Sequence, residues 1–343
     1  MIFSQTIGAI QSEDRFNQLA LEAFRYQLQR NQVYIDFTEA LGIHASSVNH
    51  YTRIPFLPIE FFKTREVYAA EEYPAITFRS SGTTGMQRSV HAVADASLYR
   101  SSLLEGFRLF YGEPSHYMIC ALTPSLRENP DSSLAYMIDS WISAGAQPGS
   151  GFFLNVPERL AELLQSAVGS GQWAVPSSKL PTANCQLPTV LVIGLTYALL
   201  DFAEQHPMPL PGAIIMETGG MKGRRQELVR EEVHTILKQA FLVETVHSEY
   251  GMSELLSQAY SQGNGRFCAP PWMKVLIRDP NDPFTWNRNG KTGGISIIDL
   301  ANWYSCPFIA TKDLGRLHED GSFEILGRFD HSDLRGCNLM MSD

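Results

Sequence analysis

Apolar residues in the first third of the chain recur at helical spacing. From Asp14 to Arg30 they alternate with Gln, Arg and Glu every three or four positions, which predicts an amphipathic helix. The apolar positions are Phe16, Leu19, Ala20, Ala23 and Phe24. Prolines between Tyr51 and Phe62 predict an extended segment. Asp95 is a suitable N-cap for a second helix that runs through Phe110.

The middle of the chain alternates continuous apolar runs with helical patterns. Strands are predicted at Tyr117–Leu122, Thr189–Gly194, Ala213–Glu217 and Val243–His247. Helices are predicted at Ser133–Ser143, from the second strand through Ala203, and at Arg224–Ala240. Because uninterrupted apolar strands are typical of sheets buried on both faces, this pattern predicts an α/β fold with parallel sheet covered by helices.

The pattern changes after Met273, where strands become short. Short strands are predicted at Lys274–Ile277, Gly294–Asp299 and Ser322–Ile325. Because Pro, Gly, Asn and Asp separate them, they predict a smaller, antiparallel, β-rich C-terminal subregion. We therefore expect an α/β core at 76–270 and the β-rich subregion at 271–343. Residues 1–75 are expected to be a helical and extended segment of the same domain as the core.

Composition narrows the class of protein. The 343 residues are 44% hydrophobic and 18% charged, which is typical of a globular protein, and the net charge of −9 argues against nucleic acid as a partner. The sequence shows no signal peptide and no apolar run long enough to span a bilayer. Its five cysteines are scattered (Cys120, Cys185, Cys268, Cys306, Cys337), which predicts free thiols and a cytoplasmic location.

A run of small residues between Phe78 and Ser89 is the first candidate for a binding site. Its glycines free backbone N–H groups to point at phosphate oxygens, and its hydroxyls add donors. The residues are Ser80, Ser81, Gly82, Thr83, Thr84 and Gly85. Arg88 can supply cationic charge, although the run lacks the Lys of a Walker P-loop. The alternative is a polar turn between two strands.

Two further runs follow predicted strands. Gly219 and Gly220 could let a flat base lie against the backbone, although a simple strand-to-helix turn would look the same. In the second run, Tyr250, Gly251, Met252 and Ser253 lead to Glu254, whose carboxylate could hold Mg²⁺. The alternative for Glu254 is a surface carboxylate at a helix N-terminus.

The last candidates lie in the β-rich subregion. Asp313 follows a predicted strand at Phe308–Thr311 and could bind both ribose hydroxyls, with Arg328 reaching the ribose or the phosphates. Alone, Asp313 could be a turn residue and Arg328 a solvated charge. His91, His116 and His247 fall near strand ends, where one of them could orient a carboxylate substrate, and no metal besides Mg²⁺ is expected.

Taken in order, these segments resemble the motifs of the adenylate-forming superfamily, which comprises acyl-CoA synthetases, adenylation domains of peptide synthetases and luciferases. The resemblance runs from about Phe78 to the C-terminus. It implies ATP and Mg²⁺ as cofactors. The matching segments are Ser81–Gly85 for the phosphates, Gly219–Gly220 for adenine, Tyr250–Glu254 for Mg²⁺ and substrate, Asp313 for the ribose, and Gly327–Asp330 for the domain hinge.

A closer resemblance is to the acyl-protein synthetase branch, the LuxE-like proteins of bacterial fatty-acid reductase systems. It rests on Leu122–Ser125 with Ser132–Met137, on the tail Leu334–Leu339, and on the short chain. In that branch a cysteine near the C-terminus accepts the acyl group, and Cys337 is the matching position. The resemblance implies a fatty acid as substrate and an acyl-carrier or reductase protein as a possible partner.

The chain departs from the superfamily pattern in two places. The phosphate loop usually continues with Pro-Lys-Gly, where this chain has Gln87-Arg88-Ser89. The chain also ends soon after Asp330, so we expect it to lack the mobile C-terminal domain with its catalytic lysine, as the LuxE-like branch does.

Three functions are therefore open. The first is ATP-dependent activation of a carboxylic acid as an acyl-adenylate, followed by transfer to a thiol. Its candidate catalytic residues are Arg88, Glu254 and Cys337, the last with a pKa that nearby Arg335 could lower. The second is an ATP-independent acyltransferase that uses Cys337. The third is a non-catalytic scaffold that retains a relic nucleotide site.

Overall fold

The computed structural model describes residues 10–81, 87–169, 188–221, 223–225 and 228–329. Its first layer is a six-stranded sheet in the order β5-β4-β6-β7-β8-β9, of which the first five strands run parallel. The strands are β4 (Tyr117–Leu122), β5 (Gly151–Phe152), β6 (Thr189–Leu195), β7 (Ile214–Thr218), β8 (Val246–Tyr250) and β9 (Ala259–Ser261).

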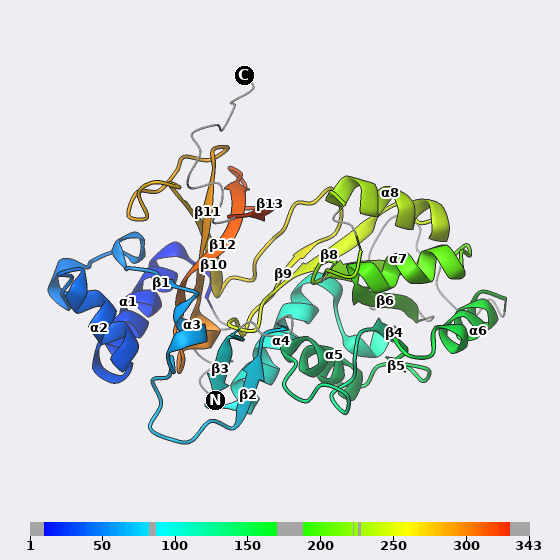
Figure 1. Cartoon of the computed structure of the whole chain (residues 1–343), viewed down its shortest axis with the longest axis horizontal. Helices are drawn as coiled ribbons and strands as arrows, with labels where there is room; N and C mark the ends of the chain where they lie inside the picture. Colours follow the sequence, from blue (N-terminus) through cyan, green and yellow to red (C-terminus); the bar gives the residue numbers. More distant parts are fainter. Residues whose placement is uncertain (1–9, 82–86, 170–187, 222, 226–227, 330–343) are drawn as a thin grey trace.

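Helices cover both faces of this sheet (Figure 1). On one face α4 (Ala96–Tyr111) and α5 (Ser133–Ser143) pack against one set of alternating strand residues, such as Ile119 and Ile193. On the other face α6 (Pro157–Gly169), α7 (Thr196–Gln205) and α8 (Arg230–Phe241) enclose a second core. Every residue of β4 and β6 is buried, which explains why the sequence shows them as continuous apolar runs.

The second sheet is mostly antiparallel and holds β10 (Met273–Arg278), β11 (Thr292–Asp299) and β12 (Phe308–Leu317), with β13 (Phe323–Arg328) on the C-terminal half of β12. The short strand β1 (Leu57–Pro58) pairs in parallel with the first half of β12. A separate hairpin contains β2 (Ile76–Arg79) and β3 (Val90–Val93). These elements confirm the predicted fold class, a helix-covered parallel sheet with a smaller antiparallel region.

The N-terminal helices α1 (Glu13–Arg30) and α2 (Gln32–Ala40) pack against the second sheet (Figure 1). The Phe24 ring meets that of Phe308 edge-on, at 6.5 Å between centroids. Ser12 caps α1 by accepting a hydrogen bond from the Arg15 amide. A short helix, α3 (Phe61–Thr64), then leads from β1 toward the hairpin.

Several predicted boundaries were wrong, and those of β8 and β12 concern the site. The strand predicted at Val243–His247 begins at Val246 and continues to Tyr250, because the left-handed conformation of Leu242 and the residues after it delay its start. The strand predicted to end at Thr311 continues to Leu317, since β13 pairs with its second half. Tyr250 and Asp313 thus lie within strands. Helix α8 begins at Arg230 and not at Arg224.

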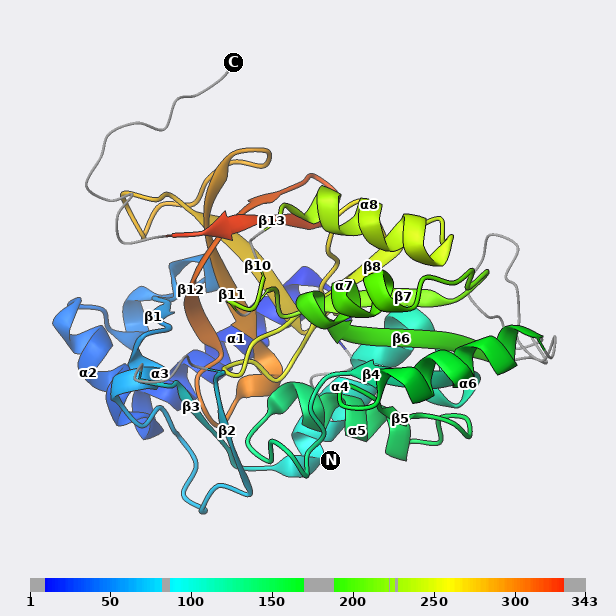
Figure 2. The ribbon, with the colours of Figure 1, turned by 45° about the vertical axis from the view of Figure 1, so that its right-hand side comes forward.

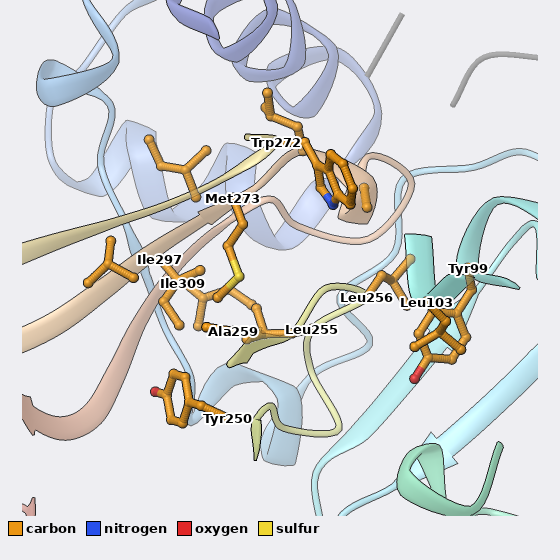
Figure 3. Packing of buried hydrophobic residues seen from close by; sticks show 14 of the residues in the cluster. Tyr99, Leu103, Tyr250, Leu255, Leu256, Ala259, Trp272, Met273, Ile297 and Ile309 are labelled. Carbon is orange, nitrogen blue, oxygen red and sulfur yellow. The ribbon is translucent and has the colours of Figure 1, made fainter. Parts of the chain in front are cut away.

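A buried carboxylate joins the two sheets. Asp299, at the end of β11, accepts hydrogen bonds from the amides of Leu256 (2.8 Å) and Ser257 (3.0 Å), and from the Ser257 hydroxyl (2.6 Å). It also accepts one from the Ala301 amide. Figure 3 shows the apolar residues of the same loop, with Leu255 facing Met273 and Leu256 turned toward helix α4. Asp299 therefore fixes the segment that connects β8 to β9.

Replacing Asp299 with Ala is expected to lower the free energy of unfolding by about 3 kcal/mol or more, because it leaves several buried donors without an acceptor. Chemical denaturation of the variant and the wild type measures this difference. A loss below about 1 kcal/mol would contradict the anchoring role of this carboxylate.

The stability of the wild type should also depend on pH through Asp299. Burial raises the pKa of this carboxyl from 3.8 to about 6, so between these values the native state holds a proton that the unfolded chain has released. The resulting stabilisation is present below pH 4 and is lost as pH rises through 6, a change of up to about 3 kcal/mol. Relative to Asp299→Asn, which cannot titrate, the wild type should become less stable over that interval in urea titrations at each pH.

Candidate functional site

A cavity of about 770 Å³ lies where the carboxyl ends of β7 and β8 face the second sheet. This is the edge at which ligands bind open α/β sheets. The structure brings most of the described candidate residues together in its wall: Ser80, Ser81, Gly219, Gly220, Tyr250, Gly251, Met252, Ser253, Glu254, Asp313 and Arg328. Segments separated by as many as 248 positions in the sequence, from Ser80 to Arg328, thus form one site.

Tyr250, Asp313 and Arg328 form a chain of polar contacts across the two sheets. The Tyr250 hydroxyl donates to Asp313 Oδ2 at 2.6 Å, and Arg328 Nε lies 3.3 Å from Asp313 Oδ1. Asp313 and Arg328 are direct register partners on β12 and β13. The Arg328 side chain is 70% exposed and that of Asp313 only 14%. Asp313 is therefore fixed at the cavity wall, while the guanidinium of Arg328 reaches outward.

Burial raises the pKa of Asp313 above its ordinary value, and the Tyr250 hydrogen bond and the Arg328 charge offset part of that rise. Burial also raises the pKa of Tyr250 well above its usual value, with a further contribution from the neighbouring Asp313. Tyr250 is consequently a neutral hydrogen-bond donor that holds the carboxylate in one orientation.

Glu254 lies on the loop after β8 and is 5% exposed. Burial raises its pKa, and the Ser89 hydroxyl and the Lys63 charge lower it in part. Lys63, on α3, also lines the cavity, but no motif in the sequence pointed to it. Glu254 is thus a buried carboxylate at the cavity, and the surface position considered from the sequence was wrong.

A buried histidine holds the Glu254 loop to the hairpin. His91, on β3, places Nδ1 2.7 Å from the Ser253 carbonyl and Nε2 2.9 Å from Asn302 Oδ1. The Asn302 amide in turn donates to the Glu254 carbonyl at 2.8 Å. Burial lowers the pKa of His91 to about 4. His91 lines neither this cavity nor the smaller one beside it, so its contacts suit a structural link and not contact with a substrate.

The two adjacent glycines after β7 adopt a backbone that other residues rarely take. Gly219 and Gly220 both have φ near +68°, so side chains there would be strained. Glu217, just before them, accepts a hydrogen bond from the Thr196 hydroxyl at 3.1 Å and lies 3.5 Å from Arg230 Nε. Although burial raises the pKa of Glu217, hydrogen bonding from His234 and the charge of Arg230 hold it below its ordinary value. Sequence reasoning did not single out Glu217 or Arg230.

Arg230 connects the cavity to the last described strand. Its guanidinium donates to the Ile325 carbonyl of β13 at 3.2 Å and lies 5.1 Å from the centre of the Phe267 ring. Figure 2 shows β13 alongside the start of α8, as this contact requires. The strand that ends at Arg328 is thereby tied to helix α8.

The hairpin loop is described only at its two ends. Arg88 Nε donates to the Ser80 carbonyl at 2.7 Å, and the Ser89 amide donates to Ser80 Oγ at 2.9 Å, so these contacts close the base of the loop. Arg88 lines a neighbouring surface cavity and not the main one. Gly82, Thr83, Thr84, Gly85 and Cys337 lie outside the described residues.

A smaller cavity of about 390 Å³ adjoins the main one. The two share a wall made of Ser81, Gly219, Glu249 and Gly251–Ser253. The Thr218 hydroxyl donates to Glu249 within this wall. The arrangement therefore offers two adjacent binding spaces, one on each side of the Tyr250–Glu254 segment.

No protein-family model and no curated protein matches this sequence. Solved structures do match. A 2-hydroxyisobutyryl-CoA ligase in an open conformation with 2-HIB-AMP and CoA shares 12% identity at a TM-score of 0.69, covering 95% of this chain and 72% of that chain. In its thioesterification state the same ligase shares 14% identity at a TM-score of 0.67, and the match covers 96% of this chain and 70% of that chain.

ATP-bound MatB from Rhodopseudomonas palustris matches at 15% identity and a TM-score of 0.51, covering 74% of this chain and 47% of that chain. The chain therefore spans about half the length of the MatB structure. At such low identities these likenesses show the fold alone: the chain has an α/β fold similar to that of these structures.

Two further observations concern the described residues alone. None of the described helices is both long and apolar enough to cross a lipid bilayer. Within the same ranges, no group of three or more His, Cys, Asp or Glu side chains is placed to share a metal ion.

Replacing Tyr250 with Phe should raise the pKa of Asp313 further, because the variant loses a hydrogen bond that stabilises the carboxylate. Carboxyl-carbon NMR titration measures this shift. Tyr34→Phe is the matched control, since the buried Tyr34 hydroxyl donates to the Pro55 carbonyl instead. An unchanged Asp313 pKa in Tyr250→Phe would show that the contact does not control the ionisation.

Proposed function

We propose that this protein activates a carboxylic acid with ATP to form an acyl-adenylate and then transfers the acyl group to a thiol. The observation that carries the proposal is the single cavity in which Gly219–Gly220, Tyr250–Glu254, Asp313 and Arg328 converge. Two independent findings support it, the motif order in the sequence and the fold shared with an ATP-bound structure.

In the first step a carboxylate oxygen attacks the α-phosphorus of ATP, and pyrophosphate leaves. Asp313 would accept hydrogen bonds from the ribose hydroxyls, and the hydrogen bond from Tyr250 supports this role by fixing the orientation of the carboxylate. Gly219 and Gly220 offer bare backbone to the adenine, while Ser80, Ser81 and the loop that follows would bind the phosphates. Positioning and charge neutralisation account for most of the catalysis in such displacements.

Glu254 fits a Mg²⁺ site. Its carboxylate is buried and lines the cavity, which suits an ion that usually keeps several waters and binds substrate phosphates beside one or two protein carboxylates. When bound, Mg²⁺ would neutralise charge on the phosphates. Arg88 remains a proposed phosphate contact through its proximity to the loop.

In the second step a thiolate attacks the acyl carbonyl, forming a thioester and releasing AMP. We propose Cys337 or a carrier thiol as the acceptor, in line with the resemblance to acyl-protein synthetases. That resemblance also favours a fatty acid as substrate, an acyl-carrier or reductase protein as partner, and a cytoplasmic location.

Acid-dependent exchange of pyrophosphate into ATP tests the first step. We expect exchange with at least one acid of a short-to-long panel. Asp313→Ala should lower kcat/KM for ATP by about 10- to 100-fold, the value of a hydrogen bond to a charged group. Asp320→Asn, which removes an exposed carboxylate of the same subregion, is the control. Acylation of the protein that disappears in Cys337→Ala would identify the acceptor.

No exchange with any acid, from a protein shown to be folded, would overturn the proposal. Acyl transfer between thioesters in the absence of ATP would then favour the acyltransferase. The absence of both activities would favour the scaffold.

Glu254→Gln should raise the Mg²⁺ concentration needed for half-maximal exchange by about tenfold or more, because one carboxylate ligand is lost. Glu244→Gln, at the opposite end of β8, serves as a control for the loss of a glutamate charge. Equal Mg²⁺ dependence in wild type and Glu254→Gln would remove Glu254 from the metal site.

A further inference from the structure

The smaller cavity has a partly apolar wall that does not line the main cavity. The apolar and aromatic side chains of this wall include Tyr99 from α4, Leu134 and Met137 from α5, and Leu195 and Tyr197 around the start of α7. Its volume of about 390 Å³ lies within the ~300–1,000 Å³ typical of small-molecule sites. An acid bound with its carboxylate at the shared wall would place its acyl group here.

Several polar side chains also line this cavity outside the shared wall, among them Arg79, Asn129, Arg224 and Gln258. Gln258, immediately before β9, is 5% exposed and lines the smaller cavity but not the main one. Its Oε1 is buried and has no hydrogen-bond partner among the described residues. Leaving a buried acceptor unpaired costs about 1–3 kcal/mol, so such a group calls for a partner.

A bare backbone position brings Gln258 to the junction of the two cavities. A Cβ on Gly251 would lie 2.5 Å from Glu249 Oε1 and 3.4 Å from Gln258 Cγ. The side chains of Glu249 and Gln258 therefore both pack over Gly251. Glu249 already accepts a hydrogen bond from the Thr218 hydroxyl. Gln258 is thus the buried polar group of the acyl side whose oxygen still needs a donor.

We propose that the acid activated here carries a hydroxyl group on its acyl chain, and that Gln258 is the residue that selects it. This inference rests on the proposed adenylation. A hydroxyl both donates and accepts, so it satisfies a glutamine amide whichever end faces the cavity. Tyr99, Leu134 and Met137 pack against the carbon skeleton. An unsubstituted hydrocarbon chain would leave the Gln258 amide unpaired, which a site of this kind discriminates against strongly.

An amino acid is the main competing substrate class. A buried ammonium group is disfavoured beside other cations, and the guanidinium-bearing residues Arg79 and Arg224 both line the smaller cavity. A neutral hydroxyl is not repelled by these cations. The geometry therefore favours the hydroxylated acid.

The test measures pyrophosphate exchange with octanoic acid, with hydroxyoctanoic acids that carry the hydroxyl at successive positions, and with aminooctanoic acids that carry an amino group at the same positions. We expect the wild type to favour one hydroxylated acid over octanoic acid by about tenfold or more in kcat/KM. Gln258→Met, which keeps the length and removes the amide, should bring this ratio close to one. Lys63→Met, on the nucleotide side, should lower exchange with both acids by the same factor and leave the ratio unchanged.

Calorimetric binding of the same acids to wild type and Gln258→Met separates this inference from the proposed function. Preferential binding of a hydroxylated acid that is lost in Gln258→Met, without any exchange, would support the cavity assignment and overturn adenylation. Exchange with equal preference for both acids, or an unchanged ratio in a folded Gln258→Met, would overturn the role of Gln258. A preference for the amino acids would overturn the hydroxyl assignment.

Discussion

The site depends on the buried carboxylate of Asp299, because this group holds the loop from which the cavity wall is built. A loop of irregular backbone between two sheets has amides that no strand can satisfy, and Asp299 accepts two of them together with the Ser257 hydroxyl. The Trp272 indole donates to the same hydroxyl at 3.0 Å. The apolar contacts of Leu255 and Leu256 act on the same few residues (Figure 3). Placement of Glu254 follows from these interactions.

Several acidic side chains line the cavity, and each of them has its own hydrogen-bond or ion-pair partner. Asp313 has Tyr250 and Arg328, Glu217 has Thr196 and Arg230, and Glu249 has Thr218. Burial in itself disfavours each charge. The hydrogen bonds and cations around them therefore decide which carboxylates stay ionised, and they also set the direction in which each oxygen points.

The sequence predicted the helices and strands whose bounds are set by neighbouring residues along the chain. β4 and α5 have the predicted bounds, because an unbroken apolar run and a Ser132 cap are both visible along the chain. The ends of β8 and β12 could not be predicted, since they depend on antiparallel pairing with the strands that follow them, β9 and β13. For the same reason motif reasoning found Asp313 and Glu254 but missed Lys63 and Glu217, which reach the cavity only through the fold. The prediction for Cys337 stays a prediction.

The shared wall between the two cavities has a consequence for how such a protein can diversify. Both cavities are lined by Ser81, Glu249 and Gly251–Ser253. A substitution there would therefore alter the binding of nucleotide and of acid together. Gln258, Leu134 and Met137 face only the smaller space. Descendants of this chain could therefore acquire new substrates by substitutions on α5 and before β9, while the partition itself would stay under constraint from both sides.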